Sequence, residues 1–570
     1  MPRPTPPRSE RLAARLAVLS RGARGFTRPG PEPRTVGSVE RGAQIVAGRF
    51  LFRGYMVEAQ GRSIWDLPLP DDPEFEAELH GCAWLDDLAA EGSARAGRLS
   101  REWVHDWARR FGAGGGPGWR ADLTGRRVAG WIAHGEMLLE DVDPATRRRF
   151  FRSLSRQVAF LSRRLRHVTE GRDRLDALHA LLLAGLHLEG HERHRDRAAA
   201  RLAAEADRLV DAEGGVAWRN PEDLSEIFVR LAHAAEALRN SGCQVPGSID
   251  GALGRAAPVL RALRHADGSL ARFHGGGRGV PGRLDAGLAC TGRARPAPDR
   301  AMGFARIAHG RTTLIVDAAA PPEGSLSSEA HASTLAFELT SGRRPIIVSC
   351  GAGRSFGPKW RRAARATASH STLAIDGYSS ARIGGEDGWL SQAPRDVRME
   401  RRRDETSTGL VAGHDGYVPS HGLTHIRQLH LDQAGRSLSG EDVLATVERE
   451  DEAIFDRAME EAGQRGFPFA VRFHLHPDIV AQKDEDPGSV LLMTKGGELW
   501  VFRHGGRAAV TIEPSVYLDS VSLSPRPTRQ IVLSTTAVDY ATRVSWTLAK
   551  ARQTPDAVRD LVHDENPVLA

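Results

Sequence analysis

A chain of 570 residues is too long for one hydrophobic core, so we expect two or three domains. The formal net charge is +6 with a pI of about 9.4, and nearly all of the positive charge is arginine, because lysine is rare. No helix-turn-helix, RNP or zinc-finger pattern accompanies this charge, so we expect no nucleic-acid partner. Two explanations of the arginines stay open: a compositional bias, or a groove that binds a polyanion through bidentate guanidinium contacts.

The four cysteines are widely spaced and include no C-x-x-C pair, which indicates neither a zinc site nor a disulfide framework. No segment has the length and apolarity of a transmembrane helix, so we expect no stable membrane insertion. The basic N-terminus lacks the apolar core of a signal peptide. The sequence therefore leaves the localisation open, and the oligomeric state is equally open.

The first half of the chain is predicted to be helical. Residues 1–40 are rich in proline and arginine and predict a disordered basic tail. Residues 41–295 form the predicted helical domain, because apolar residues recur there at spacings of three and four, as at Leu175, Leu178 and Leu182. Eight or more successive helices fit a bundle, a solenoid or an incomplete (α/α) toroid, and no clean repeat selects one of them.

The second half is predicted to be a β-sandwich. Residues 270–300 are rich in glycine, proline and arginine and predict a crossing segment. From residue 301 the apolar period changes to two, and many short strands without intervening helices predict a large antiparallel β-sandwich over residues 300–550. Residues 551–570 are the predicted C-terminal tail.

Candidate functional residues concentrate between residues 325 and 377. A predicted strand at Thr334–Leu339 leads through a tight turn to a second strand. A glycine-rich loop and an arginine-rich segment follow, and a third strand begins after His370. Since His331 precedes the first strand and His370 the third, we expect both histidines at one end of one sheet, facing one site.

The motifs of this region resemble the C-terminal domain of the heparinase II/III-like family of polysaccharide lyases. The pattern of that domain is roughly H-A-D, then P-L-L-V-D-P-G, then W-R-R-x-x-R-x-x-x-x-H-N-T-L-x-V-D-G. The corresponding segments here are His331-Ala332-Ser333, Pro345 through Gly351, and Trp360-Arg361-Arg362 through His370 to Gly377. The resemblance covers residues 300–550 well and residues 41–295 with weaker motifs, and it favours the incomplete toroid for the helical domain.

The chemistry that this resemblance implies is β-elimination of an acidic, uronate-containing polysaccharide. A base removes the proton next to the carboxyl group, an acid protonates the leaving oxygen, and a cationic group neutralises the carboxylate. The implied catalytic candidates are His331, His370, Glu329 and Tyr417, with Glu329 standing where lyases of the family can place a catalytic histidine. The candidate substrate-binding residues are Arg361, Arg362 and Arg365, which match W-R-R-x-x-R.

The resemblance also implies a structural metal at His331 and His370, with an aspartate from V-D-P-G. That aspartate position is Ser349, a poor zinc ligand, and the aspartate of H-A-D is Ser333. We therefore expect no cofactor, and zinc at the two histidines stays as the alternative. In another interpretation the two histidines bind loop backbone or each other.

Two functions remain in view. The first is a lyase, favoured by the retained histidines and arginines. The second is a catalytically degenerate glycan-binding protein, or one associated with cell-envelope polysaccharide, since relatives often act in the periplasm or envelope. It is favoured by Glu329, by Ser349 and by the absence of any tyrosine between Tyr55 and Tyr378, where the family's acid/base tyrosine would lie. No constellation supports a hydrolase with paired carboxylates.

Overall fold

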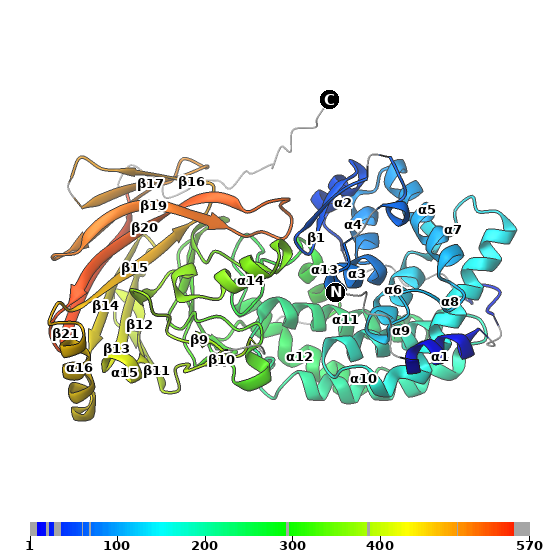
Figure 1. The fold of residues 1–570 in the computed structure, drawn as a ribbon, viewed down its shortest axis with the longest axis horizontal. Helices are drawn as coiled ribbons and strands as arrows, with labels where there is room; N and C mark the ends of the chain where they lie inside the picture. The colour runs from blue at the N-terminus through cyan, green and yellow to red at the C-terminus, as the bar shows by residue number, and fades with distance from the viewer. Residues whose placement is uncertain are drawn as a thin grey trace.

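The computed structural model describes residues 8–18, 22–27, 36–59, 61–67, 70–291, 296–384, 388–486 and 488–551. A helical part built from the first half of the chain lies beside a β-sandwich built from the second half (Figure 1). The predicted fold class, a toroid-like helical domain followed by a large antiparallel β-sandwich, is confirmed. Parts of the predicted tail at 1–40, and all of the tail at 551–570 except Ala551, lie outside the described residues.

Short and medium helices make up the helical part, together with one small hairpin. The helices are α1 (Arg8–Ala17), α2 (Val39–Val46), α3 (Pro73–Gly81), α4 (Trp84–Glu91), α5 (Ala94–Arg110), α6 (Ala121–Ala133), α7 (Gly135–Leu139), α8 (Pro144–Arg164), α9 (Arg172–His187), α10 (Arg195–Leu209), α11 (Pro221–Asn240), α12 (Gly247–Ala262) and α13 (Arg283–Ala289). The hairpin is β1 (Arg49–Phe52) and β2 (Tyr55–Glu58). Among the described helices, none has the length and apolarity needed to cross a membrane.

Three of these helices begin with the same local device. Asp72, Asp143 and Asn220 each stand one residue before a proline, and each side chain accepts hydrogen bonds from two backbone N–H groups of the first turn. Proline suits the first helical position, where no intrahelical partner exists for an N–H group, and the capping side chain satisfies the donors that follow. The sequence therefore fixes the starts of α3, α8 and α11 locally.

The helical core is built on tryptophan and on one central helix. Trp84, Trp107, Trp119 and Trp131 are fully buried. Helix α9 packs against α6, α8, α10 and α11 and is buried without interruption from Leu175 to His187. A helix that is buried on all sides lies inside its domain, so α9 is the element around which the other helices are arranged.

Two antiparallel sheets form the sandwich. One has the strand order β11 (Val397–Arg403), β12 (Ser407–Tyr417), β13 (Leu423–Asp432), β14 (Ser437–Ala445), β21 (Ala541–Lys550), β18 (Leu499–Gly505), β17 (Ser489–Thr494) and β16 (Ile479–Lys483). The other has the order β19 (Ala509–Tyr517), β20 (Arg526–Ala537), β15 (Phe467–Leu475), β7 (Arg344–Val348), β6 (Phe337–Ser341), β5 (Thr312–Asp317), β4 (Phe304–His309) and β3 (Arg300–Ala301), with β8 (Leu373–Ile375) also paired to β15. Strict alternation of buried and half-buried residues along β13 shows which face meets the core.

Short helices and a two-stranded ribbon complete the sandwich. The helices are α14 (Pro358–Ala364), α15 (Val418–His421) and α16 (Arg449–Glu461), and the ribbon is β9 (Arg382–Ile383) with β10 (Leu390–Ser391). The sequence analysis did not predict α16. The predicted strand Thr334–Leu339 is also wrong in its start: β6 begins at Phe337, because Leu335 has a φ of 63° that interrupts extended backbone.

Two buried arginines join the helical part to the sandwich. Arg219, just before α11, donates to the carbonyls of Met302, Gly303, Ala319 and Ala320. Arg272 donates to the carbonyls of Ser349, Cys350 and Leu518. The tip of the β1–β2 hairpin adds a third contact, in which the Gly54 N–H donates to the Ser355 carbonyl at 2.8 Å.

Candidate functional site

His331 and His370 lie together, as expected from their positions before two strands. Their ring centroids are 5.0 Å apart. His331 lies in the loop before β6, and its Nε2 accepts the Gly275 N–H at 3.0 Å. His370 precedes β8, and its Nδ1 lies 3.1 Å from Ser349 Oγ. The segments that carry H-A-S, V-S-C-G and H-S-T-L thus meet at one end of the sheet.

Both rings are buried, which limits what they can do. His331 is 2% exposed and His370 is 0% exposed. Burial, followed by the neighbouring His370, lowers the pKa of His331, and burial lowers the pKa of His370 to about 3. Both rings are therefore neutral at physiological pH and covered by protein. In this geometry His331 binds loop backbone, and the two rings pack against each other.

A zinc ion does not fit the donors that this cluster offers. His331 Nδ1 and His370 Nε2 have no hydrogen-bond partner, but the third position is the neutral hydroxyl of Ser349. Structural zinc sites use four ligands that are mostly thiolate, imidazole or carboxylate. In the part of the chain that the structure describes, no group of three or more such side chains has an arrangement suited to a metal ion.

The Ser333 hydroxyl binds the carboxylate of Asp317, the last residue of β5. Its Oγ donates to Asp317 Oδ2 at 2.7 Å, and His274 Nε2 lies 3.3 Å from the same oxygen. Arg219 binds the other oxygen of Asp317. Burial alone would raise the pKa of Asp317, but Arg219 and His274 outweigh it and lower the pKa. The sequence analysis missed Asp317, Arg219 and His274, because no local motif marks residues that meet across the domain boundary.

Glu329 is held by an arginine of the predicted substrate-binding segment. Arg361 Nε lies 3.1 Å from Glu329 Oε2, and Arg361 Nη2 lies 2.6 Å from Oε1. The two side chains are 30% and 35% exposed. Both carboxylate oxygens of Glu329 are thus occupied in a bidentate pair, the geometry that guanidinium prefers.

This pair stands at one end of a network of acids and arginines that runs into the helical part. Arg354 lies 3.6 Å from Glu74, and Arg53 lies 3.3 Å from Glu78. The further pairs are Arg41 with Glu78 and Asp87, Arg283 with Glu226, Arg230 with Asp176, Arg126 with Asp173 and Asp176, and Arg172 with Asp223. We call these residues the acid–arginine network.

The acids and arginines of the network neutralise one another's charge. Burial alone would raise the pKa of Glu226, but Arg283, Arg230 and Arg172 outweigh it and lower the pKa to about 2. The carboxylates and the guanidinium groups of the network are equal in number, so each arginine has an acid beside it. An acidic sugar entering this region would therefore meet arginines that are already paired and carboxylates that repel it.

The three predicted substrate-binding arginines have different positions. Arg361 is paired with Glu329, and Arg362 is exposed. Arg365 is buried, with Nε donating to the Ala330 carbonyl and Nη2 to the Ser327 carbonyl. The guanidinium of Arg365 thus connects the loop before β6 to the end of α14, and its predicted contact with substrate would require it to leave these carbonyls.

The predicted acid Tyr417 lies inside the protein. Its side chain is 0% exposed, and its hydroxyl donates to the Leu373 carbonyl at 3.0 Å. Burial raises its pKa above the usual value. The ring belongs to the sandwich core, where no polysaccharide reaches it.

The helical part contains a single tyrosine among the described residues, at its β1–β2 hairpin. Tyr55, on β2, is the last tyrosine before Tyr378, and its hydroxyl lies 3.3 Å from Asp72. The helical part does contain a buried histidine pair, with His179 Nε2 at 3.1 Å from His233 Nδ1. Burial lowers the pKa of His233 to about 4, so this pair is neutral as well.

Comparison with known proteins gives consistent results. A family model described as Heparinase II/III-like, C-terminal matches residues 291–547. The FtsZ-localized protein C of Caulobacter vibrioides is 31% identical over 490 residues, which cover 84% of this chain and 82% of that protein.

Solved structures show the same fold at low identity. A heparan sulfate lyase HepC mutant from Pedobacter heparinus is 17% identical with a TM-score of 0.57, over 95% of this chain and 88% of that one. A heparinase III structure is 14% identical with a TM-score of 0.64, over 95% and 89% of the two chains. The likeness extends over both domains of this chain.

Proposed function

This chain belongs to the heparinase II/III-like family and has a polysaccharide lyase fold, and from this premise we propose that it binds an acidic polysaccharide without cleaving it. The observation that carries the proposal is the pair between Glu329 and Arg361. It occupies the position where the family resemblance leads us to expect a catalytic histidine. A carboxylate whose two oxygens are both bound to guanidinium has neither oxygen directed at a substrate proton.

The other requirements of β-elimination are also unmet by the predicted residues. An acid must reach the leaving oxygen, but Tyr417 is enclosed in the sandwich core. A base must reach the sugar ring, but His331 and His370 are covered by protein. A cationic group must neutralise the uronate, but each guanidinium group of the acid–arginine network is already paired with a carboxylate.

The Caulobacter relative supports a proposal about where the protein works. The name of that protein, FtsZ-localized protein C, associates it with FtsZ. We extend this to the present chain and propose that it acts beside FtsZ, with the polysaccharide as a second ligand. Co-sedimentation of the purified chain with FtsZ polymers tests the extension; a chain that stays in the supernatant at every polymer concentration contradicts it.

The decisive test of the proposed function measures cleavage and binding on the same samples. The full-length chain is incubated with heparan sulfate and chondroitin sulfate, and the ultraviolet absorbance of the unsaturated uronate product is followed, with an active heparinase III as positive control. We expect no rise, together with saturable binding in a calorimeter. A rise in absorbance that is lost in Glu329→Gln would overturn the proposal and restore the lyase.

A further inference from the structure

The cationic side chains on and just after helix α14 lie in two different surroundings. Arg361 points to Glu329, and Arg365, just after the helix, binds the loop carbonyls. Lys359, Arg362 and Ala363, spaced by three and four residues, line a different hollow. Residues at this spacing share one face of a helix, so α14 directs one cationic face away from the acid–arginine network.

This hollow has the size of a ligand site. Its volume is about 620 Å³, and its opposite wall is formed by Gly377, Tyr378, Ser379, Ala381, Arg382 and Ile383. Sites for small ligands and sugar units usually have volumes of about 300–1,000 Å³. We call it the α14 basin.

Tyr378 gives the α14 basin an aromatic surface. Its side chain is 40% exposed, and the Arg382 guanidinium carbon lies 5.4 Å from its ring centroid. The ring of His421 meets it at 4.5 Å and 84°, which fixes its orientation. An aromatic ring with an adjacent cation can bind a sugar ring by packing and the acidic substituent of that sugar by charge.

Within the described ranges, the lining of the α14 basin carries only positive charge. Lys359, Arg362 and Arg382 line it, and no carboxylate does so among the described residues. A second hollow of about 110 Å³ continues from it past the same Tyr378 and Arg382, and adds the polar side chains of Gln392 and Ser420. The cationic basin followed by the polar hollow matches an extended ligand in which an acidic unit stands next to a neutral hydroxylated unit.

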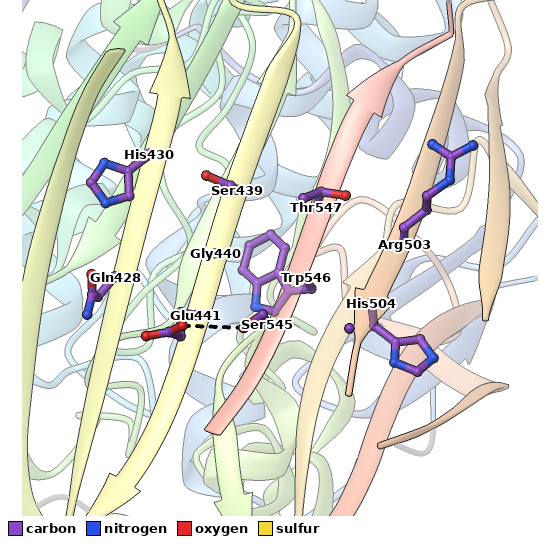
Figure 2. A pocket seen from close by; sticks show the side chains of 11 residues that line it. Gln428, His430, Ser439, Gly440, Glu441, Arg503, His504, Ser545, Trp546 and Thr547 are labelled. Atoms are coloured by element: carbon purple, nitrogen blue, oxygen red, sulfur yellow. Dashed lines mark hydrogen bonds between the residues drawn. The ribbon is translucent and has the colours of Figure 1, made fainter. Parts of the chain in front are cut away.

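The charge of the α14 basin differs from that of another hollow in the same molecule. Another hollow, of about 480 Å³, lies on the outer face of the eight-stranded sheet (Figure 2). There Ser545 Oγ donates to Glu441, Arg543 lies 3.4 Å from Glu441, and Arg503 lies 3.9 Å from Asp486. The sheet face is thus polar with compensated charge, whereas the α14 basin is cationic.

We propose that the α14 basin is the acidic-glycan site of this protein, with Lys359, Arg362 and Arg382 binding carboxylate or sulfate groups and Tyr378 packing against a sugar ring. This inference rests on the proposed glycan-binding function and places its site on the side of α14 that carries Lys359 and Arg362, away from the acid–arginine network. Of the three arginines that match the family motif, only Arg362 then contacts the ligand.

The test is calorimetric titration of the full-length chain with heparan sulfate and chondroitin sulfate oligosaccharides. The variant is Arg362→Gln with Arg382→Gln, and the matched control is Arg503→Gln with Arg543→Gln on the sheet face, which removes the same charge. A charge-assisted hydrogen bond contributes roughly 1.5–3 kcal/mol, so we expect the α14 variant to weaken binding at least about tenfold. Tyr378→Ala should weaken it as well, and the sheet-face control should stay within about twofold of wild type.

The outcomes separate the two proposals. Wild-type binding that the α14 variant leaves unchanged overturns the α14 basin and leaves glycan binding standing. No wild-type binding to either oligosaccharide overturns both. Binding of an acidic polyglutamate peptide but of neither sugar, lost in the α14 variant, overturns the glycan assignment and identifies a peptide site. Thermal melting of each variant checks that the fold is intact.

Discussion

Asp442 is the buried charge on which three strands of the eight-stranded sheet converge. Its Oδ1 accepts hydrogen bonds from Arg427 Nε at 2.7 Å and His425 Nε2 at 2.8 Å, and its Oδ2 accepts one from Trp546 Nε1 at 3.0 Å. Arg427 and Asp442 are both fully buried. Burial alone would raise the pKa of Asp442, but Arg427 outweighs it and the pKa is lowered.

Replacing Asp442 by asparagine should destabilise the protein strongly. The change leaves the buried Arg427 charge uncompensated, and removing one partner of a buried pair costs about 3–5 kcal/mol. Urea unfolding followed by tryptophan fluorescence measures it. Asp456→Asn, which changes an acid bound to the exposed Tyr540, is the control and should cost no more than about 0.5 kcal/mol. Equal effects of the two changes would contradict the assignment.

The sequence predicted individual residues where a local pattern marks them. His331 and His370 could be brought together because each lies in a segment that leads into a strand of one sheet. The partners of Glu329 and Ser333 could not be predicted, since Arg361 and Asp317 approach only after the loops and the domain boundary have folded. One motif contains Arg361, Arg362 and Arg365. Their side chains nevertheless have different surroundings, because α14 directs them to different sides.

The β1–β2 hairpin is held against the sandwich at Gly54. Its φ is +86°, and a Cβ added there would lie 2.8 Å from the backbone of Gly357. Both features demand glycine, because a side chain would be strained in this conformation and would press on the loop that carries Arg354. The contact therefore couples an element of the helical part to the loop before α14.

Gly54→Ala should weaken this contact measurably beyond the backbone effect. Gly61→Ala is the matched control, because Gly61 has a φ of +79° and nothing within 4 Å of its added Cβ. The control should lower the free energy of unfolding by about 1–2 kcal/mol, because alanine is strained in the left-handed backbone. At Gly54, overpacking should lower it by about 1–3 kcal/mol more. Urea midpoints and hydrogen exchange at residues 351–357 test this. Identical losses and unchanged exchange would refute the contact.

Helices and strands were predicted well where apolar residues recur at regular spacing, and poorly where charged residues interrupt that spacing. The long helices and most sandwich strands follow from apolar spacing. Helix α16 was missed because acidic residues dominate it, although Glu448 and Asp451 form a capping box that marks its start. The start of β6 was misplaced because the apolar run continues through Leu335, whose backbone is not extended.

Buried neutral histidines are distributed over both domains. Burial lowers the pKa of His80 and His370 to about 3, and that of His191, His233 and His421 to about 4. In the unfolded chain a histidine has a pKa of about 6.5. The unfolded state therefore binds protons between pH 6.5 and about 4 that the folded state does not, so stability is complete above pH 6.5 and falls as the pH falls.

The protein should consequently lose stability in mildly acidic solution. Each such histidine contributes up to about 1.4 kcal/mol per pH unit. Urea midpoints at pH 7.5, 6 and 5 should decrease steadily, and His370→Gln should make the decrease shallower by the share of one group. Constant midpoints over this range would show that these histidines are protonated in the folded state.

Arg219 and Arg272 also determine how the two domains can move. Together they donate to seven carbonyl groups of the sandwich segment, and Arg219 also binds Asp317. A hinge motion between the domains would leave these buried donors unsatisfied, at about 1–3 kcal/mol each. Many enzymes close domains around a substrate to exclude water. The contacts of Arg219 and Arg272 oppose such a closure, so we expect the proposed glycan to meet a surface that is already in its final shape.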